Sequence, residues 1–270
     1  NEFVGGTILG GDRSAHEPVG GNQLSEPVGG LTMMGKPVAV TDTSTLPSGA
    51  MFDARYTIVN FLGQGGMGSV YQAVDTRLGQ MVALKSLRPE VASDPVMVEI
   101  LGREVALGQR LNHPNLLRTH HLETSGEAPY VVMELLDGGD LDEHLASKGG
   151  KLSVDEAVGF MREVLSALSA LHNEKIAHLD VKPANVLLSR AGAVKLSDFG
   201  ISSRLRDQRD GGLAAGTPEY APPEQLSGGP CDVRADVYAA GMMLQRLVSG
   251  GFPFALTDLQ TVRGWHESGE

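Results

Sequence analysis

The sequence contains a single cysteine, Cys231, and few basic residues. One cysteine excludes an internal disulfide bond and is typical of a reducing compartment, so we expect a cytoplasmic location. The 22 lysines and arginines stand against 33 acidic residues, which gives a net charge of −11. A protein that binds a phosphate backbone needs a basic surface, so we do not expect nucleic acid as a partner.

Long apolar runs are also absent from the sequence. No run approaches the roughly 18–20 residues that a membrane-spanning helix requires, so we expect no membrane span within this chain. The first residues do not form the basic and then apolar regions of a signal peptide. The chain starts with Asn1 instead of Met, and we interpret it as a fragment or a processed product.

Residues 1–50 differ in composition from the rest of the chain. They hold ten glycines and four prolines but one aromatic residue, Phe3. Such a segment buries too little apolar surface to offset the entropy lost on ordering. We predict a flexible linker. A docking or modification segment is the alternative, because hydroxyl residues cluster at positions 41–45.

A glycine-rich stretch with Gly63, Gly65 and Gly68 follows a strand expected over residues 56–62. It is either an ordinary tight turn, because glycine supplies the backbone angles that turns need, or a flap whose amides approach phosphates. The pattern over residues 69–75 predicts a strand, whereas a dinucleotide-binding motif requires a helix there.

Lys85 lies in a third predicted strand, over residues 81–87, among apolar neighbours. We expect it to have an anionic partner. The helix predicted over residues 95–111 offers Glu104. The two could form a surface ion pair, worth roughly 0–1 kcal/mol, or a pair that orients Lys85 toward a phosphate.

Further elements are predicted along the chain. Strands over residues 116–122 and 130–136 would complete the sheet, and residues 137–140 form a turn between two lobes. A helix over residues 153–172 starts with Ser153 as the capping candidate and Glu156 three residues on. Short strands at 186–188 and 194–196 and a helix over 233–248 follow. In the helix over residues 153–172, apolar residues recur at helical spacing and predict core positions: Val154, Ala157, Val158, Met161, Val164, Leu165, Leu168 and Leu171.

Two short acidic loops carry Asp180, Lys182 and Asn185, and then Asp198. A carboxylate can accept a hydroxyl proton, while a second carboxylate and an amide oxygen suit Mg²⁺, which prefers hard oxygen ligands. A lysine can offset negative charge on a group in transfer. Acidic loops are common, so these residues alone leave a purely structural role open.

Over residues 56–254 the chain resembles the eukaryotic-like (Hanks-type) Ser/Thr protein kinases of bacteria, whose signature motifs occur here in order. The matching residues are Gly63, Gly65, Gly68 and Val70 of the glycine-rich loop, Lys85, Glu104, Asp180, Asn185, Asp198, Thr217 and Glu224 near the end of the activation segment, and Asp236.

The resemblance implies an α+β fold with two lobes. Residues 51–136 would form an N-lobe with a five-stranded antiparallel sheet and one helix, and residues 137–270 a mainly helical C-lobe. It implies a signalling, autophosphorylating enzyme that transfers the γ-phosphate of ATP to Ser/Thr hydroxyls of protein substrates, with Mg²⁺, or Mn²⁺ as an alternative, as cofactor. A nucleotide-binding pseudokinase or scaffold is the other function considered.

The resemblance also implies individual roles. Asp180 would be the catalytic base, Lys182 a catalytic partner that is typical of Ser/Thr kinases, and Asn185 and Asp198 the metal ligands. His178 would be structural, Asp236 would brace the catalytic loop, and Thr217 would lie near the acceptor hydroxyl. The ATP-binding residues would be Leu62, Gly63, Gly65, Gly68, Val70, Ala83, Lys85, Glu104, Met133, Glu134, Leu136, Asp140 and Leu187.

The sequence departs from the family at several positions. Leu179 replaces an arginine that usually meets a phosphate on the activation segment, so we do not expect loop phosphorylation to be the main switch. Gly108 replaces a larger apolar residue expected against Phe199, which would loosen the active arrangement. Pro222 replaces an alanine, a mild change.

The family also continues beyond Phe254 with further helices and an arginine that pairs with the residue matching Glu224. We therefore expect an incomplete C-lobe and an unpaired Glu224. An unpaired buried charge costs several kcal/mol.

Overall fold

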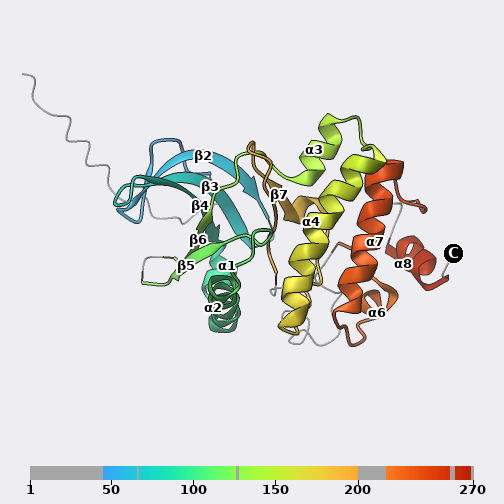
Figure 1. Ribbon diagram of the computed structural model, residues 1–270. Coiled ribbons are helices and arrows are strands. Elements are labelled where there is room, and N and C mark those ends of the chain that lie inside the picture. Colours follow the sequence, from blue (N-terminus) through green and yellow to red (C-terminus); the bar gives the residue numbers. More distant parts are fainter. Residues whose placement is uncertain (1–44, 66, 126–127, 200–216, 256–258, 269–270) are drawn as a thin grey trace, which may run out of the picture. The chain divides into compact units, whose positions relative to one another are not determined.

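The computed structural model describes residues 45–65, 67–125, 128–199, 217–255 and 259–268 (Figure 1). Residues 1–44, which hold most of the predicted linker, and residues 200–216 of the predicted activation segment lie outside these ranges. No helix in the described part of the chain is long and apolar enough to cross a membrane.

The first lobe is built on a six-stranded antiparallel sheet with the order β1-β2-β3-β4-β6-β5. The five predicted strands are all present, and the two-residue β1, too short to show alternation, adds an edge. The bounds are β1 (Met51–Phe52), β2 (Tyr56–Gln64), β3 (Gly68–Asp75), β4 (Gln80–Leu87), β5 (Thr119–Glu123) and β6 (Tyr130–Glu134).

The strand predicted over residues 116–122 starts later, at Thr119. Leu116 instead forms a parallel bridge with Leu196 of the other lobe, and the Leu117 amide donates to the Leu196 carbonyl at 2.9 Å. A contact with a distant segment therefore removes these residues from the sheet.

The sheet packs around the aromatic rings of Tyr56 and Tyr130, both almost fully buried. Phe52 meets Tyr130 edge-on at 4.9 Å between ring centroids, a favourable geometry for aromatic pairs. The Arg55 guanidinium pairs with the buried carboxylate of Asp75 at 2.7 Å. This core supports the strands that carry the predicted nucleotide-binding residues.

Two helices accompany the sheet, α1 (Pro89–Ala92) and α2 (Pro95–Arg110). The Asp94 side chain caps α2 by accepting from the Val96 amide at 2.9 Å, and Pro95 suits the first helical position. The helix predicted over residues 95–111 is therefore confirmed, and it packs against β5.

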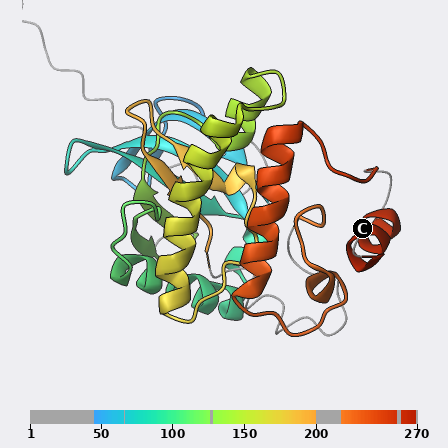
Figure 2. The same cartoon turned by 45° about the vertical axis from the view of Figure 1, so that its right-hand side comes forward.

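The second lobe is mainly helical. It contains α3 (Leu141–Ser147), α4 (Val154–Asn173), a 3-10 turn (Pro183–Asn185), β7 (Val186–Leu188), β8 (Val194–Leu196), α6 (Pro223–Leu226), α7 (Arg234–Ser249) and α8 (Leu259–Ser268). Helices α4 and α7 lie side by side in both views (Figures 1 and 2). The predicted α+β architecture, with a sheet lobe and a helical lobe, is thus observed.

Helix α4 confirms its predicted cap, because the Glu156 amide donates to Ser153 Oγ at 3.3 Å. The predicted core stripe is only partly right. Val154, Val158 and Leu165 are 65%, 52% and 46% exposed, whereas the other five positions are buried. With about 100° per residue, these three positions lie together on one flank of the stripe, and the helix buries a narrower face than the sequence suggested.

Helix α8 lies against α6 at the end of this lobe. Val262 and His266 of α8 are buried, and the Phe254 ring packs against Trp265 at 4.8 Å between centroids. Within the described residues the Glu224 carboxylate forms no ion pair. It is only partly buried, so it does not carry the full desolvation cost.

Candidate active site

Four of the predicted residues meet at the loop between α4 and β7, and three of them belong to this loop while Thr217 comes from the segment before α6. Lys182 Nζ lies 2.9 Å from Asp180 Oδ2 and donates to Thr217 Oγ1 at 2.8 Å. Asn185 Nδ2 donates to Asp180 Oδ2 at 3.0 Å and to the Asp180 carbonyl at 2.7 Å. The loop therefore presents one carboxylate, one ammonium and one amide around a hydroxyl.

Asp236 of α7 holds this loop in place. Its carboxylate is fully buried and accepts the backbone amides of His178 at 2.8 Å and Leu179 at 2.7 Å. His172 Nε2 lies 2.7 Å from the same carboxylate. This is the bracing role that the resemblance implied for Asp236.

The braced backbone is strained at Leu179, which has a φ of +63°. A non-glycine residue in the left-handed region costs roughly 1–2 kcal/mol. The bonds from Asp236, and one from Gln225 Nε2 to the Leu179 carbonyl at 2.9 Å, offset that cost. Strain of this kind often occurs at functional sites.

His178 connects the two acidic loops and is fully buried. Its Nδ1 accepts the Asp180 amide at 3.3 Å, so Nε2 carries the proton and donates to the Ser197 carbonyl at 2.9 Å. With both ring nitrogens engaged by the backbone, His178 has the structural geometry expected of it.

Lys85 pairs with a different acid from the one expected. Its Nζ lies 2.7 Å from Asp198 Oδ1, and among the described residues Glu104 forms no ion pair with it. Glu104 Oε2 is buried without a hydrogen-bond partner. The predicted Lys85–Glu104 pair is therefore absent in this conformation, because two carboxylates compete for one ammonium and Asp198 holds it.

These contacts shift the ionisation of all three groups. The Lys85 ammonium holds the pKa of Asp198 below its usual value. Burial lowers the pKa of Lys85, but the attraction of Asp198 and Glu104 outweighs it and leaves the pKa raised. Burial raises the pKa of Glu104 well above its usual value, although Lys85 opposes this change. Strongly perturbed groups in one cluster are typical of functional sites.

The strands align the residues predicted to surround adenine. Val70 of β3 lies opposite Lys85, and Ala83 of β4 lies opposite Met133 of β6. A Cβ atom on Gly68 would lie 1.8 Å from the Ser86 carbonyl oxygen, so this glycine is required by strand packing alone. Leu62 is 47% exposed, at the entrance to the glycine-rich stretch.

Two further predicted residues, Asp140 and Leu187, are neighbours through their backbones. Asp140 forms an isolated bridge with Leu187 of β7. The Asp140 side chain also caps α3 by accepting the Glu143 amide at 2.9 Å, and burial raises its pKa. We missed this cap, which the Asp140 and Glu143 spacing could have indicated.

Leu136 follows β6 and is partly buried, and Glu134 ends that strand. The Glu134 carboxylate pairs with Lys195 of β8 at 2.8 Å. Lys195 could not be identified from the sequence, because no short motif connects it with Glu134.

Gly108 lies against Phe199 as expected, but the space is filled. A Cβ atom there would lie 3.0 Å from Thr119 Oγ1 and 3.5 Å from Phe199 Cζ. Behind the site, a pocket of about 710 Å³ separates α2 from the catalytic loop, and Glu104 and Leu179 line it. Open volume is therefore available next to the unpaired Glu104 carboxylate.

Comparisons with known proteins agree with this geometry. The protein kinase domain family matches residues 56–267. The chain is 37% identical over 209 residues to a probable serine/threonine-protein kinase PknB of Lactococcus lactis, covering 76% of this chain and 33% of that protein. It is 36% identical over 225 residues to the serine/threonine-protein kinase PknA of Mycobacterium tuberculosis, covering 81% and 52%.

A solved structure supports the fold. The crystal structure of the Mycobacterium tuberculosis PknI kinase domain matches with a TM-score of 0.63 and 32% identity, over 82% of this chain and 86% of that one. The chain spans only a third to about half of the two curated relatives. The two-lobed kinase fold is confirmed, and the chain belongs to the protein kinase domain family, among bacterial serine/threonine kinases of the Hanks type.

Proposed function

We propose that this chain transfers the γ-phosphate of ATP to serine or threonine hydroxyls of proteins. The observation that carries the proposal is the position of the Thr217 hydroxyl, which lies 2.8 Å from Lys182 Nζ and 3.5 Å from Asp180 Oδ1. A hydroxyl can thus lie between a carboxylate that accepts its proton and an ammonium that stabilises negative charge. An acceptor side chain requires the same surroundings.

Each residue of the loop then has a chemical role. Asp180 orients the acceptor hydroxyl and takes its proton. Lys182 offsets the charge that develops on the transferred group. Positioning and charge stabilisation account for most of the catalysis of phosphoryl transfer, so the buried Asp236 contributes by keeping Asp180 in place.

The donor set at Asn185 and Asp198 fits Mg²⁺. The bonds of the Asn185 amide nitrogen to Asp180 leave its oxygen as the atom suited to a cation, and Asp198 supplies a carboxylate. The described residues contain no cluster of three or more His, Cys, Asp or Glu side chains for a metal. Mg²⁺ needs none, because it is usually held by one or two carboxylates together with phosphates. When bound, the ion neutralises charge on the phosphates.

The nucleotide would lie along β3, β4 and the end of β6. Val70, Ala83 and Leu187 offer apolar contacts to the adenine ring, and the backbone of Glu134 and Leu136 offers hydrogen bonds. Lys85 would exchange Asp198 for the phosphates, with Glu104 as its new partner. We infer a cytoplasmic enzyme with protein substrates and no nucleic-acid partner, from the single cysteine and the net charge of −11.

Labelled ATP with Mg²⁺ tests the proposal, with the chain itself and a generic basic protein as acceptors. We expect label on both, and Asp180→Ala should reduce transfer by about a hundredfold or more while ATP still binds. Asp155→Ala, at an exposed position on α4, is the matched control and should transfer at the wild-type rate. Equal transfer by Asp180→Ala would overturn the assignment. ATP binding without any transfer by the wild-type chain would favour the pseudokinase function instead.

A further inference from the structure

The segment between α2 and β5 connects the two lobes through β8. The Leu196 amide donates to the Asn115 carbonyl at 2.8 Å, and the Leu117 amide donates to the Leu196 carbonyl at 2.9 Å. Leu116 and Leu196 form a parallel bridge. Residues 115–117 therefore lie along β8 like an additional strand, although they lead into the sheet of the other lobe.

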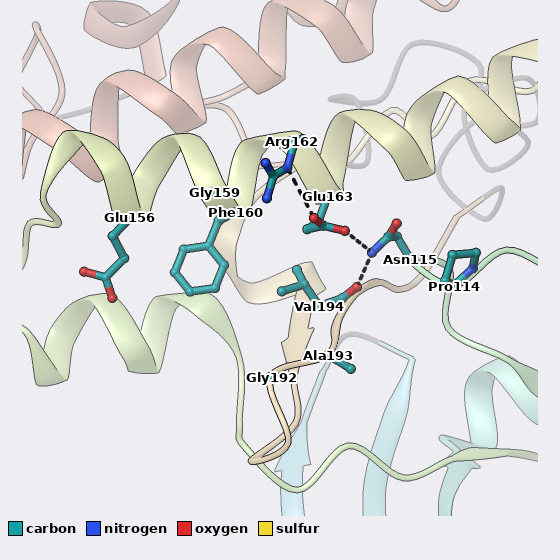
Figure 3. A pocket seen from close by; sticks show the side chains of 10 residues that line it. All are labelled: Pro114, Asn115, Glu156, Gly159, Phe160, Arg162, Glu163, Gly192, Ala193 and Val194. Carbon is teal, nitrogen blue, oxygen red and sulfur yellow. Dashed lines mark hydrogen bonds and ion pairs between the residues drawn. The ribbon is translucent and has the colours of Figure 1, made fainter.

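The Asn115 side chain anchors this segment to the helical lobe. Asn115 is 8% exposed, and its Nδ2 donates to Glu163 Oε2 of α4 at 2.9 Å and to the Val194 carbonyl at 3.0 Å. Figure 3 shows both bonds at one end of a pocket of about 450 Å³ between α4 and the β7–β8 turn. The Arg162 guanidinium lies 3.5 Å from the other Glu163 oxygen, so the Glu163 carboxylate is engaged from two sides.

The other end of the segment is tied to the last residue of β6. The Glu134 amide donates to the Arg118 carbonyl at 3.0 Å, and the Glu134 carboxylate accepts the Arg118 amide. The same carboxylate oxygen lies 2.8 Å from Lys195 Nζ of β8. Lys195 also donates to the Leu116 carbonyl at 3.4 Å. The Lys195 ammonium thus connects β8, which carries it, with the end of β6 and with residues 115–118.

These side chains lie between two halves of the proposed nucleotide site. Glu134 belongs to the backbone proposed to bind adenine, and Asp198, the proposed metal ligand, lies two residues after the end of β8. The ion pair is largely shielded, with side-chain exposures of 16% for Lys195 and 26% for Glu134. A shielded pair resists thermal displacement better than an exposed one, because water competes less for its charges.

We propose that Lys195 is a positioning residue for ATP. Together with Glu134 and Asn115 it forms a brace that fixes the adenine-binding backbone relative to Asp198. The brace acts on binding of the nucleotide and not on proton transfer, since none of its side chains contacts Asp180 in the described residues. This inference rests on the proposed function, because it assumes that the nucleotide occupies the site described above.

The test is Lys195→Met, which keeps the apolar stem and removes the ammonium. We expect KM and Kd for ATP to rise about tenfold, while kcat stays near the wild-type value. A rise of this size corresponds to the free energy of one charged hydrogen-bonded contact. Lys195→Arg should recover much of the affinity because it restores the cation. Lys151→Met, at an exposed lysine, should leave both parameters unchanged.

A double-mutant cycle adds a readout that general loss of structure would not give. Lys195→Met and Glu134→Gln should each weaken ATP binding, and the combined variant should be little weaker than either, because both remove the same contact. Melting temperatures of all variants identify any that fail to fold. If Lys195→Met is among these, the ATP affinity of Lys195→Arg is compared with that of the wild type instead. Unchanged KM and Kd, or a rise in kcat, would overturn the proposal, the latter by showing that the brace restrains turnover.

Kd values for ATP measured by calorimetry do not depend on phosphate transfer. They therefore test the role of Lys195 separately from the proposed kinase activity. If the wild-type chain binds ATP but transfers no phosphate, the kinase proposal fails while the binding data still decide the role of Lys195. If Lys195→Met binds ATP like the wild type in a chain that does transfer phosphate, the brace alone fails.

Discussion

The Lys85 ammonium lies 2.7 Å from Asp198 Oδ1, and the buried Glu104 Oε2 has no hydrogen-bond partner among the described residues. The lysine that should bridge the nucleotide and α2 is thus engaged with the proposed metal ligand. Binding of a cation by Asp198 would release Lys85, and Glu104, which lines an open pocket, is the carboxylate available to receive it. The unpaired state of Glu104 has a measurable consequence for stability.

We predict that Glu104 makes folding stability fall as pH rises above the usual glutamate range. Burial raises the pKa of Glu104 in the folded chain, whereas it ionises near pH 4.3 when unfolded. Its contribution is fully present below that pH and is lost as the pH rises toward the folded pKa, because the unfolded state releases the proton first. Urea unfolding of the wild type and of Glu104→Gln across pH 4–8 measures this loss as a difference that grows with pH. Parallel stability curves would contradict it.

A second prediction concerns Asp236, which holds the loop that carries Asp180. Asp236→Asn replaces the carboxylate that accepts the His178 and Leu179 amides with a neutral side-chain amide. The NH2 group of that amide cannot accept a hydrogen bond from a backbone N–H. We expect a loss of about 2–4 kcal/mol of unfolding free energy, together with a large loss of phosphate transfer, because the left-handed Leu179 is no longer held. Chemical denaturation and an initial-rate assay measure the two effects. Asp232→Asn, whose carboxylate pairs with Arg234 at the surface, is the control and should change neither.

Much of this arrangement could be predicted from the sequence. The cap at Ser153, the strands on both sides of the glycine-rich stretch and the proximity of Asp180, Lys182 and Asn185 follow from local patterns or short spacings. The two-lobed fold followed from the resemblance, since each motif was present in order.

The partner of Lys85 could not be predicted. Asp198 and Glu104 are both acids at suitable places in the chain, and the choice between them depends on where the folded chain places each carboxylate relative to Lys85. The Glu134–Lys195 pair was missed for a related reason, because only the folded chain brings β6 and β8 together at residues 115–118. The exposed Val154 shows that a helical pattern identifies an apolar face but not how much of it the neighbours cover.

A third prediction is that activity does not depend on phosphorylation of the activation segment. Leu179, which replaces the usual arginine, is 6% exposed and offers no cation to a phosphate. Treatment of the active chain with a phosphatase should therefore leave the rate of transfer unchanged relative to a mock-treated sample. Phosphate release and the initial rate with a generic substrate are the measurements. A large loss of rate would show that another cation does what the arginine does elsewhere.

The two glycines of α2 lead to a fourth prediction, because they differ only in their surroundings. A Cβ atom on Gly102 would meet Leu122 at an ordinary 3.7 Å, whereas one on Gly108 would lie 3.0 Å from Thr119 Oγ1. Alanine should stabilise a helix interior by roughly 0.5–1 kcal/mol relative to glycine. Gly102→Ala should therefore raise stability without changing kcat.

Gly108→Ala should gain less stability, or none, because Thr119 and the Phe199 ring must give way to the new methyl group. Phe199 follows Asp198 directly, so its displacement should also lower kcat, which initial rates measure at saturating ATP. The double variant Gly108→Ala/Thr119→Ala removes the hydroxyl nearest the new Cβ and should recover both stability and kcat. If Gly108→Ala behaves like Gly102→Ala, the contact with Phe199 does not limit the position of Asp198. A kcat that the double variant fails to restore would instead place the constraint on Phe199 itself.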